Sequence, residues 1–157
     1  MIDQIYTYFT IEMIFMWLNL GVLPFWLILI IFPQSQICRF FVTSIFPIFI
    51  LSLTYGYLLY LFFNEGHDFI RNFELYLGLD SLSNLFTDKT FIILFWLHFL
   101  TMNLFCGGWI VKDSQKFGIS RVLLSFPILI TYFIGPIGLS LYWIIRIFYA
   151  KKINLYD

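Results

Sequence analysis

Four long apolar blocks dominate the chain, at about residues 11–32, 40–63, 91–111 and 122–147. Each reaches or exceeds the ~20 residues that a helix needs to cross a hydrocarbon core of about 30 Å. Backbone amides in lipid must form hydrogen bonds within their own segment, so such blocks are helices. The pattern predicts an all-α integral membrane protein, in which four helices form an antiparallel bundle and residues 1–157 make a single membrane domain.

The segment 64–90 is the one long connection between these blocks. Apolar residues recur through it among acidic ones: Phe69, Phe73, Leu75, Leu77, Leu79, Leu82 and Leu85. Such an amphipathic pattern predicts a short helix that lies on the membrane surface, with its apolar side toward the lipid. The alternative is a solvated acidic loop.

Composition supports the membrane assignment and narrows the function. Hydrophobic residues make up 61% of the chain and charged residues 11%, against about a quarter charged in a soluble domain. The formal net charge is zero, so we expect no nucleic-acid partner. Cys38 and Cys106 have no neighbouring cysteine or histidine at a metal-site spacing. We expect membrane lipid as a partner, and neither a metal nor a cofactor.

Charged residues gather at the ends of the blocks. With four spans, both chain ends and the segment 64–90 would share one side of the membrane. Asp113 follows Lys112 in a basic connection on the other side, and Arg146 falls at the depth of Glu12, with which we expect it to pair. We interpret Lys112, Asp113 and Arg146 as structural charges. Basic residues are split almost evenly between the sides, and their denser packing in the short connections favours a cytoplasmic location for those.

Counting 1.5 Å per residue inward from the first side places four polar side chains at one level. They come from the four blocks, about seven or eight residues inside each: Asn19, Tyr55, His98 and Ser140. One layer deeper lie Asn103 and the pair Gly135 and Pro136. This convergence predicts a ligand site inside the bundle, lined by these residues and walled by Phe95 on the face of His98.

His98 and Asn103 are the least expected residues in the spans, because polar side chains at membrane depth are costly. An imidazole can take up and release a proton near neutral pH, which makes His98 the plausible proton carrier. We therefore treat His98 and Asn103 as candidate catalytic residues. The alternative is that each joins two helices through a hydrogen bond.

Pro136 predicts a break in the fourth block. Because proline lacks an amide hydrogen, the carbonyl of Tyr132 would lose its donor in a continuous helix. We expect a kink at Gly135 and Pro136, approached by a side chain of the third block. Asn103 shares that level, and its amide could donate to the Tyr132 carbonyl.

Three runs of residues carry a resemblance to a known family. They are residues 17–26 (WLNLGVLPFW), 96–113 (WLHFLTMNLFCGGWIVKD) and 135–139 (GPIGL), the last followed by Arg146. Over essentially its whole length the chain resembles the abscisic-acid-deficient-4-like membrane proteins. That family includes the neoxanthin synthase of plants and many bacterial members.

The resemblance implies a four-helix, multi-pass protein of a bacterial inner membrane or a photosynthetic membrane. In plants and algae it implies a role in converting violaxanthin to neoxanthin, a redox-neutral rearrangement of an epoxide end group to an allene. Compared with the bacterial pattern of that family, the chain differs at two positions. Asn103 stands where the bacterial pattern has an aspartate, and Gly108 where it has an arginine. An amide cannot accept a proton as an aspartate would.

The sequence favours two functions over a third, a small-solute carrier, for which four spans without internal repeats would need to oligomerise to form a path. The first is the binding or isomerisation of a carotenoid or another isoprenoid, with His98 and Asn103 addressing its polar end group. The second is a non-catalytic role, as a small subunit or assembly factor of a larger membrane complex. The second function requires a membrane-protein partner, and a homo-oligomer is compatible with either.

Overall fold

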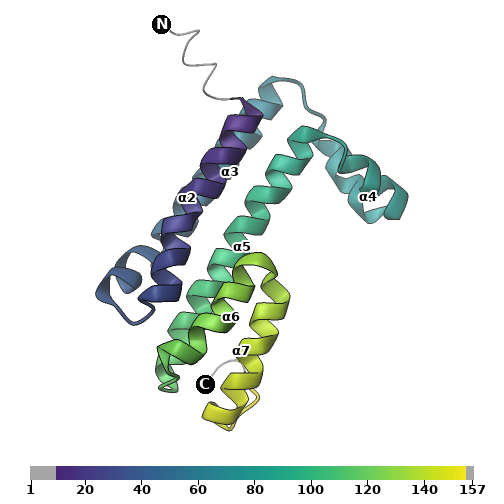
Figure 1. Ribbon diagram of the computed structural model, residues 1–157. Coiled ribbons are helices and arrows are strands. Elements are labelled where there is room, and N and C mark those ends of the chain that lie inside the picture. The colour runs from purple at the N-terminus through teal and green to yellow at the C-terminus, as the bar shows by residue number, and fades with distance from the viewer. Residues whose placement is uncertain (1–9, 155–157) are drawn as a thin grey trace, which may run out of the picture. The chain divides into compact units, whose positions relative to one another are not determined.

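The computed structural model describes residues 10–154, and every regular element in that range is helical (Figure 1). In chain order the elements are α2 (Ile11–Ile31), a π-helix (Cys38–Val42), α3 (Phe46–Asn64), a 3₁₀ helix (Phe69–Tyr76), α4 (Leu79–Leu85), α5 (Lys89–Lys116), α6 (Arg121–Phe133) and α7 (Gly135–Ala150). The all-α prediction is confirmed.

Three segments are long and apolar enough to cross a membrane. They are Ile11–Ile31, Cys38–Asn64 and Lys89–Lys116, and they correspond to the first three predicted apolar blocks with shifted ends. In the second segment the α-helical part begins at Phe46, after a bend over residues 43–45. The Ser44 hydroxyl oxygen accepts a hydrogen bond from the Phe46 amide at 3.2 Å, just before the first turn of α3.

The fourth apolar block is not one span, which corrects the predicted count of four. The chain leaves the helix at Ile134 (φ −140°, ψ 79°) and reverses, so that α6 and α7 pack side by side as a helical hairpin (Figure 1). Pro136 lies in the first turn of α7, where a missing amide hydrogen costs no helical bond. Gly138 then packs directly on Thr131, so close that a Cβ at position 138 would overlap the Thr131 backbone.

Packing divides the chain into two compact units. The first unit comprises residues 1–21 and 50–100, and the second comprises residues 22–49 and 101–157. Residues 1–9 and 155–157 lie outside the described range. The sequence-based prediction of a single membrane domain remains a prediction.

The connection 64–90 belongs to the first unit and is largely helical, as its amphipathic pattern predicts. Asp68 caps the 3₁₀ helix, since its carboxylate accepts a hydrogen bond from the Ile70 amide at 2.9 Å. Apolar side chains such as Ile70, Phe73 and Leu77 are largely exposed on these short helices. Their location on the membrane surface remains a prediction.

Candidate functional site

Asn19 has a structural partner in the first unit. Its side-chain oxygen accepts a hydrogen bond from the Trp96 indole nitrogen at 3.2 Å, and its side-chain nitrogen donates to the Phe15 carbonyl at 2.7 Å. Phe15 and Trp96 also pack ring against ring, with centroids 5.8 Å apart. No sequence pattern marks Trp96 as the partner of Asn19, because the two residues lie 77 positions apart in the chain. The amide of Asn19 therefore joins α2 to α5, and its predicted ligand role remains untested.

His98 and Phe95 are exposed on α5, and the same helix face continues with Met102 and Phe105. His98 is therefore exposed on its own helix, and its predicted place in a ligand site inside the bundle remains a prediction. Periodicity placed these residues on one face, but an apolar face of a membrane helix can meet lipid as readily as protein. Tyr55 is half-buried, and its proposed ligand contact is likewise untested.

Ser140 lies in α7, and its hydroxyl donates to the Pro136 carbonyl one turn earlier at 2.8 Å. The predicted depth of Ser140 assumed a helix that continues through the membrane. Because α7 runs back along α6, that count no longer applies. Ser140 and Pro136 remain candidate ligand residues by prediction alone.

Asn103 is a residue of α5, and its side chain contacts the tip of the α6–α7 hairpin at Gly135. Its side chain is 6% exposed, and its oxygen is in close contact with the position that a Cβ would take on Gly135. The predicted approach of Asn103 to the break is confirmed. The predicted bond to the Tyr132 carbonyl is not found: within the described part of the chain, Asn103 Nδ2 has no hydrogen-bond partner.

A buried charge cluster ties α5 to α7 in the second unit. Asp113 and Arg146 are each 3% exposed. One carboxylate oxygen of Asp113 accepts from Arg146 Nε and from the Tyr142 hydroxyl, both at 2.7 Å. The other carboxylate oxygen lies 4.0 Å from Lys116 Nζ. The Arg146 guanidinium also lies over the Phe117 ring, 4.8 Å from its centroid.

These contacts correct one expected pairing. Arg146 binds Asp113 and not Glu12, because the hairpin returns α7 to the end of α5. Glu12 instead accepts a hydrogen bond from Lys89 Nζ at 2.8 Å, in an exposed pair of the first unit. Lys112 does not join the cluster around Asp113 and instead lines a separate groove.

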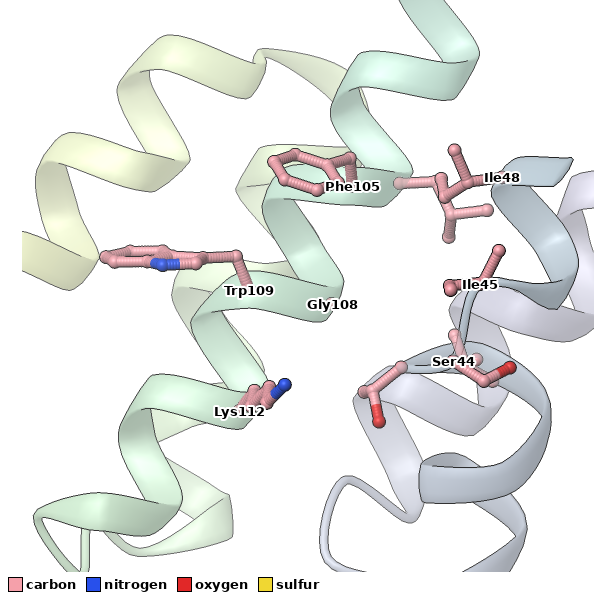
Figure 2. Close-up of a pocket in the computed structure, with 10 residues that line it drawn as sticks. Ser44, Ile45, Ile48, Phe105, Gly108, Trp109 and Lys112 are labelled. Carbon is pink, nitrogen blue, oxygen red and sulfur yellow. The ribbon is translucent and has the colours of Figure 1, made fainter. Parts of the chain in front are cut away.

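That groove has a volume of about 350 Å³ and lies between the start of α3 and the second half of α5 (Figure 2). Its lining residues are mostly apolar: Val42, Thr43, Ser44, Ile45, Ile48, Leu104, Phe105, Gly108, Trp109 and Lys112. Figure 2 shows Phe105 and Ile48 toward one end and Lys112 and Ser44 toward the other. The groove is therefore an apolar slot with one polar end.

Gly108 keeps this slot open. A Cβ there would have only ordinary contacts, 3.8 Å from the Val42 carbonyl oxygen and 4.0 Å from Thr43 Cα, so a long side chain at this position would fill the groove. The next residue, Trp109, lines the groove and packs edge-on against the Tyr142 ring, with centroids 5.8 Å apart. Trp109 thus lies next to both the groove and Tyr142, which belongs to the buried charge cluster.

The described residues were also compared with the requirements of a metal site. Among residues 10–154, no group of three or more histidine, cysteine, aspartate or glutamate side chains is placed to hold a metal ion.

Comparison with known proteins gives one match. A family model described as ABA DEFICIENT 4-like matches residues 13–142, which is most of the chain. No curated protein and no solved structure matches.

Proposed function

Because this chain belongs to the ABA DEFICIENT 4-like family, we propose that it binds one end of a long isoprenoid, of the carotenoid class, within the membrane. The observation that supports this most directly is the groove of Figure 2, an apolar slot with a polar end. Its volume falls in the range of about 300–1,000 Å³ that is usual for small-molecule sites.

The walls of the groove suit a hydrocarbon chain. Ile45, Ile48, Leu104 and Phe105 contribute apolar surface. Trp109 also lines the groove, with its indole directed away from α3 (Figure 2). Ile45 is 81% exposed, so the groove opens toward the surroundings of the chain, where a lipid-soluble ligand would arrive. Burial of apolar ligand surface against such walls supplies most of the binding free energy.

The polar end suits an oxygenated end group. Lys112 carries an ammonium that donates hydrogen bonds, while its neighbour Asp113 is occupied by Arg146 and Tyr142. The Ser44 hydroxyl oxygen accepts from the Phe46 amide, which leaves the hydroxyl proton available to donate. These groups would orient a hydroxyl, ether or carbonyl oxygen at the end of a polyene.

Isomerisation is a further step of the proposal. A redox-neutral rearrangement needs a proton donor and acceptor within about 2.6–3.2 Å of the reacting atoms. Asp113 and Tyr142 are not among the residues that line the groove, and Tyr142 packs against Trp109. Lys112 is the ionisable group that lines it. The geometry therefore supports binding more strongly than catalysis.

The test is pigment retention by the full chain purified in mild detergent from a carotenoid-producing host. We expect polyene absorption bands in the wild type. Gly108→Leu should lose most of them, because its side chain fills the groove. Gly56→Leu is the matched control, since a Cβ at Gly56 meets nothing within 4 Å. If Gly108→Leu accumulates in folded form and keeps the pigment, the groove is not the binding site.

The carotenoid profile of the host tests isomerisation. Isomerisation is supported if the wild-type protein changes the carotenoid profile of its host and the Lys112→Gln variant does not.

A second candidate, a subunit of a larger membrane complex, is favoured by one observation. The exposed imidazole of His98 on an apolar face of α5 would be costly in contact with lipid alone. A photo-crosslinking residue at His98 should then capture a different protein in stoichiometric amount. Adducts with lipid alone count against this role.

Substitution of His98 tests its place in the ligand site. His98→Ala and His98→Gln are produced in a pigment-producing host, and if both variants keep the bound ligand unchanged, His98 is not part of the ligand site.

A further inference from the structure

Positive charge is concentrated in the second unit. Seven of the nine lysine and arginine residues lie there, and seven of the nine acidic residues lie in the first unit. Arg146 is buried against Asp113, the one carboxylate in the described part of the second unit. The other six basic residues are exposed: Arg39, Lys112, Lys116, Arg121, Lys151 and Lys152. The second unit therefore presents cations with no exposed carboxylate among its described residues.

These six residues share one end of the second unit. Lys112 and Lys116 are in the last turns of α5, and Arg121 begins α6 three residues beyond the turn at Gly118. The pairing of Asp113 with Arg146 holds the end of α7, and hence Lys151, beside the end of α5. The chain after α2 is held there as well, because Gln115 Nε2 donates to the Pro33 carbonyl at 3.2 Å. We call this end the basic face.

Exposed aromatic side chains accompany the basic face. Phe40 and Phe41 follow Arg39 in the π-helix, and Phe148 and Tyr149 lie in the last turn of α7, shortly before Lys151. Aromatic side chains beside lysine and arginine are typical of the boundary between lipid headgroups and hydrocarbon. The basic face therefore has the composition of a surface that lies at this boundary.

We infer that the basic face binds the headgroups of anionic phospholipids and lies on the cytoplasmic side of the membrane. Clustered cations next to membrane-spanning segments attract anionic lipid. A soluble polyanion such as nucleic acid fits less well, because it would leave the neighbouring aromatic side chains in water. The two ends of α5 also differ, since the first unit, which holds its start, has the two basic residues Arg71 and Lys89, against seven in the second unit, which holds its end. The positive-inside rule therefore favours a cytoplasmic location for the end of α5.

The hairpin is what makes this charge bias strong. If the fourth block crossed the membrane, Lys151 and Lys152 would lie on the opposite side from Lys112 and Arg121. Because α7 folds back along α6, the basic residues that follow α7 return to the end of α5. The inference rests on this reversal and is independent of the proposed isoprenoid site.

Lipid retention in nanodiscs tests the inference. The full chain is reconstituted with equal amounts of phosphatidylglycerol and phosphatidylcholine, and the lipids that stay bound are measured by native mass spectrometry. We expect phosphatidylglycerol to be enriched in the wild type, and less so at high salt. Arg121→Gln with Lys151→Gln should lower the enrichment several-fold. Arg71→Gln with Lys89→Gln removes the same charge from the first unit and should leave the enrichment unchanged. Equal enrichment in both double variants overturns the lipid assignment.

Cysteine labelling tests the orientation separately. Ser120, exposed in the turn before α6, is replaced by cysteine in a Cys38→Ser, Cys106→Ser background. A membrane-impermeant maleimide should label Ser120→Cys in inside-out vesicles and not in intact cells. Labelling in intact cells would place the basic face on the outer side and overturn the inference.

Discussion

Arg146 Nε lies 2.7 Å from Asp113 Oδ2, which joins two residues 33 positions apart in the chain and buries both charges. This ion pair connects the end of α5 to α7, and it forms only because the fourth apolar block reverses at Ile134. The exposed pair of Glu12 and Lys89 has a similar distance, 2.8 Å, but lies in the open. The two pairs therefore provide a matched comparison of buried and exposed charge.

Removing one partner of the buried pair should destabilise the protein strongly. Arg146→Met leaves the Asp113 carboxylate buried with less compensation, at a cost of about 3–5 kcal/mol. The measurement is thermal unfolding in mild detergent. Lys89→Met, which breaks the exposed pair, should leave the melting temperature nearly unchanged.

The double variant Asp113→Leu, Arg146→Met completes this cycle. We expect it to be more stable than Arg146→Met alone, because no buried charge is left unpaired. If the double variant loses as much as the sum of the two single variants, the pair does not couple.

Gly138 should tolerate no side chain. A Cβ at this position would overlap the Thr131 backbone, so Gly138→Ala must push α6 and α7 apart, at a cost of about 1–3 kcal/mol or more. Gly56→Ala is the control, because a Cβ there meets nothing within 4 Å, and alanine is the better helix former by up to about 1 kcal/mol. Equal unfolding temperatures for the two variants would contradict the close packing of the hairpin.

Neighbouring glycines on α5 should differ in the same assay. A Cβ at Gly107 would lie 3.0 Å from two ring carbons of Trp26, which is buried, whereas the closest atom to a Cβ at Gly108 is 3.8 Å away. Gly107→Ala should therefore destabilise by about 1–3 kcal/mol, and Gly108→Ala should be neutral or stabilising. The reverse order would show that Trp26 can move aside.

Asn103 should accept an apolar replacement better than a charged one. Its Nδ2 has no partner among the described residues, so Asn103→Leu removes an unsatisfied donor and should change stability little. Asn103→Asp buries an unpaired charge beside Gly135 and should lower the melting temperature clearly. A large loss in Asn103→Leu would indicate that the amide has a bound partner in the purified protein.

Local signals in the sequence predicted much of this architecture. The length and apolarity of three blocks predicted the three candidate spans, and Pro136 predicted a break to which Asn103 is close. Sequence could not distinguish a kink from a reversal, because proline fits both a bent helix and the first turn of a new one. The decision lies in contacts distant along the chain, above all Gly138 on Thr131 and Asp113 with Arg146.

The candidate site was harder to predict than the fold. Counting depth along straight helices placed Arg146 beside Glu12 and Ser140 beside His98, and the reversal removes the basis for both. The groove depends on the bend at residues 43–45 and on the absence of a side chain at Gly108. Neither feature gives a periodic signal, so the groove becomes visible only in three dimensions.

The link between Asp113 and Arg146 also sets an order of events during synthesis. A ribosome that adds about 5–20 residues per second completes Arg146 about 2–7 s after Asp113. Until then the carboxylate near the end of α5 lacks its buried partner, and hydration favours a water-accessible position for it. Burial of Asp113 therefore has to wait until the chain has been made through Arg146, so we expect a nascent chain halted before Arg146 to leave the end of α5 incompletely packed.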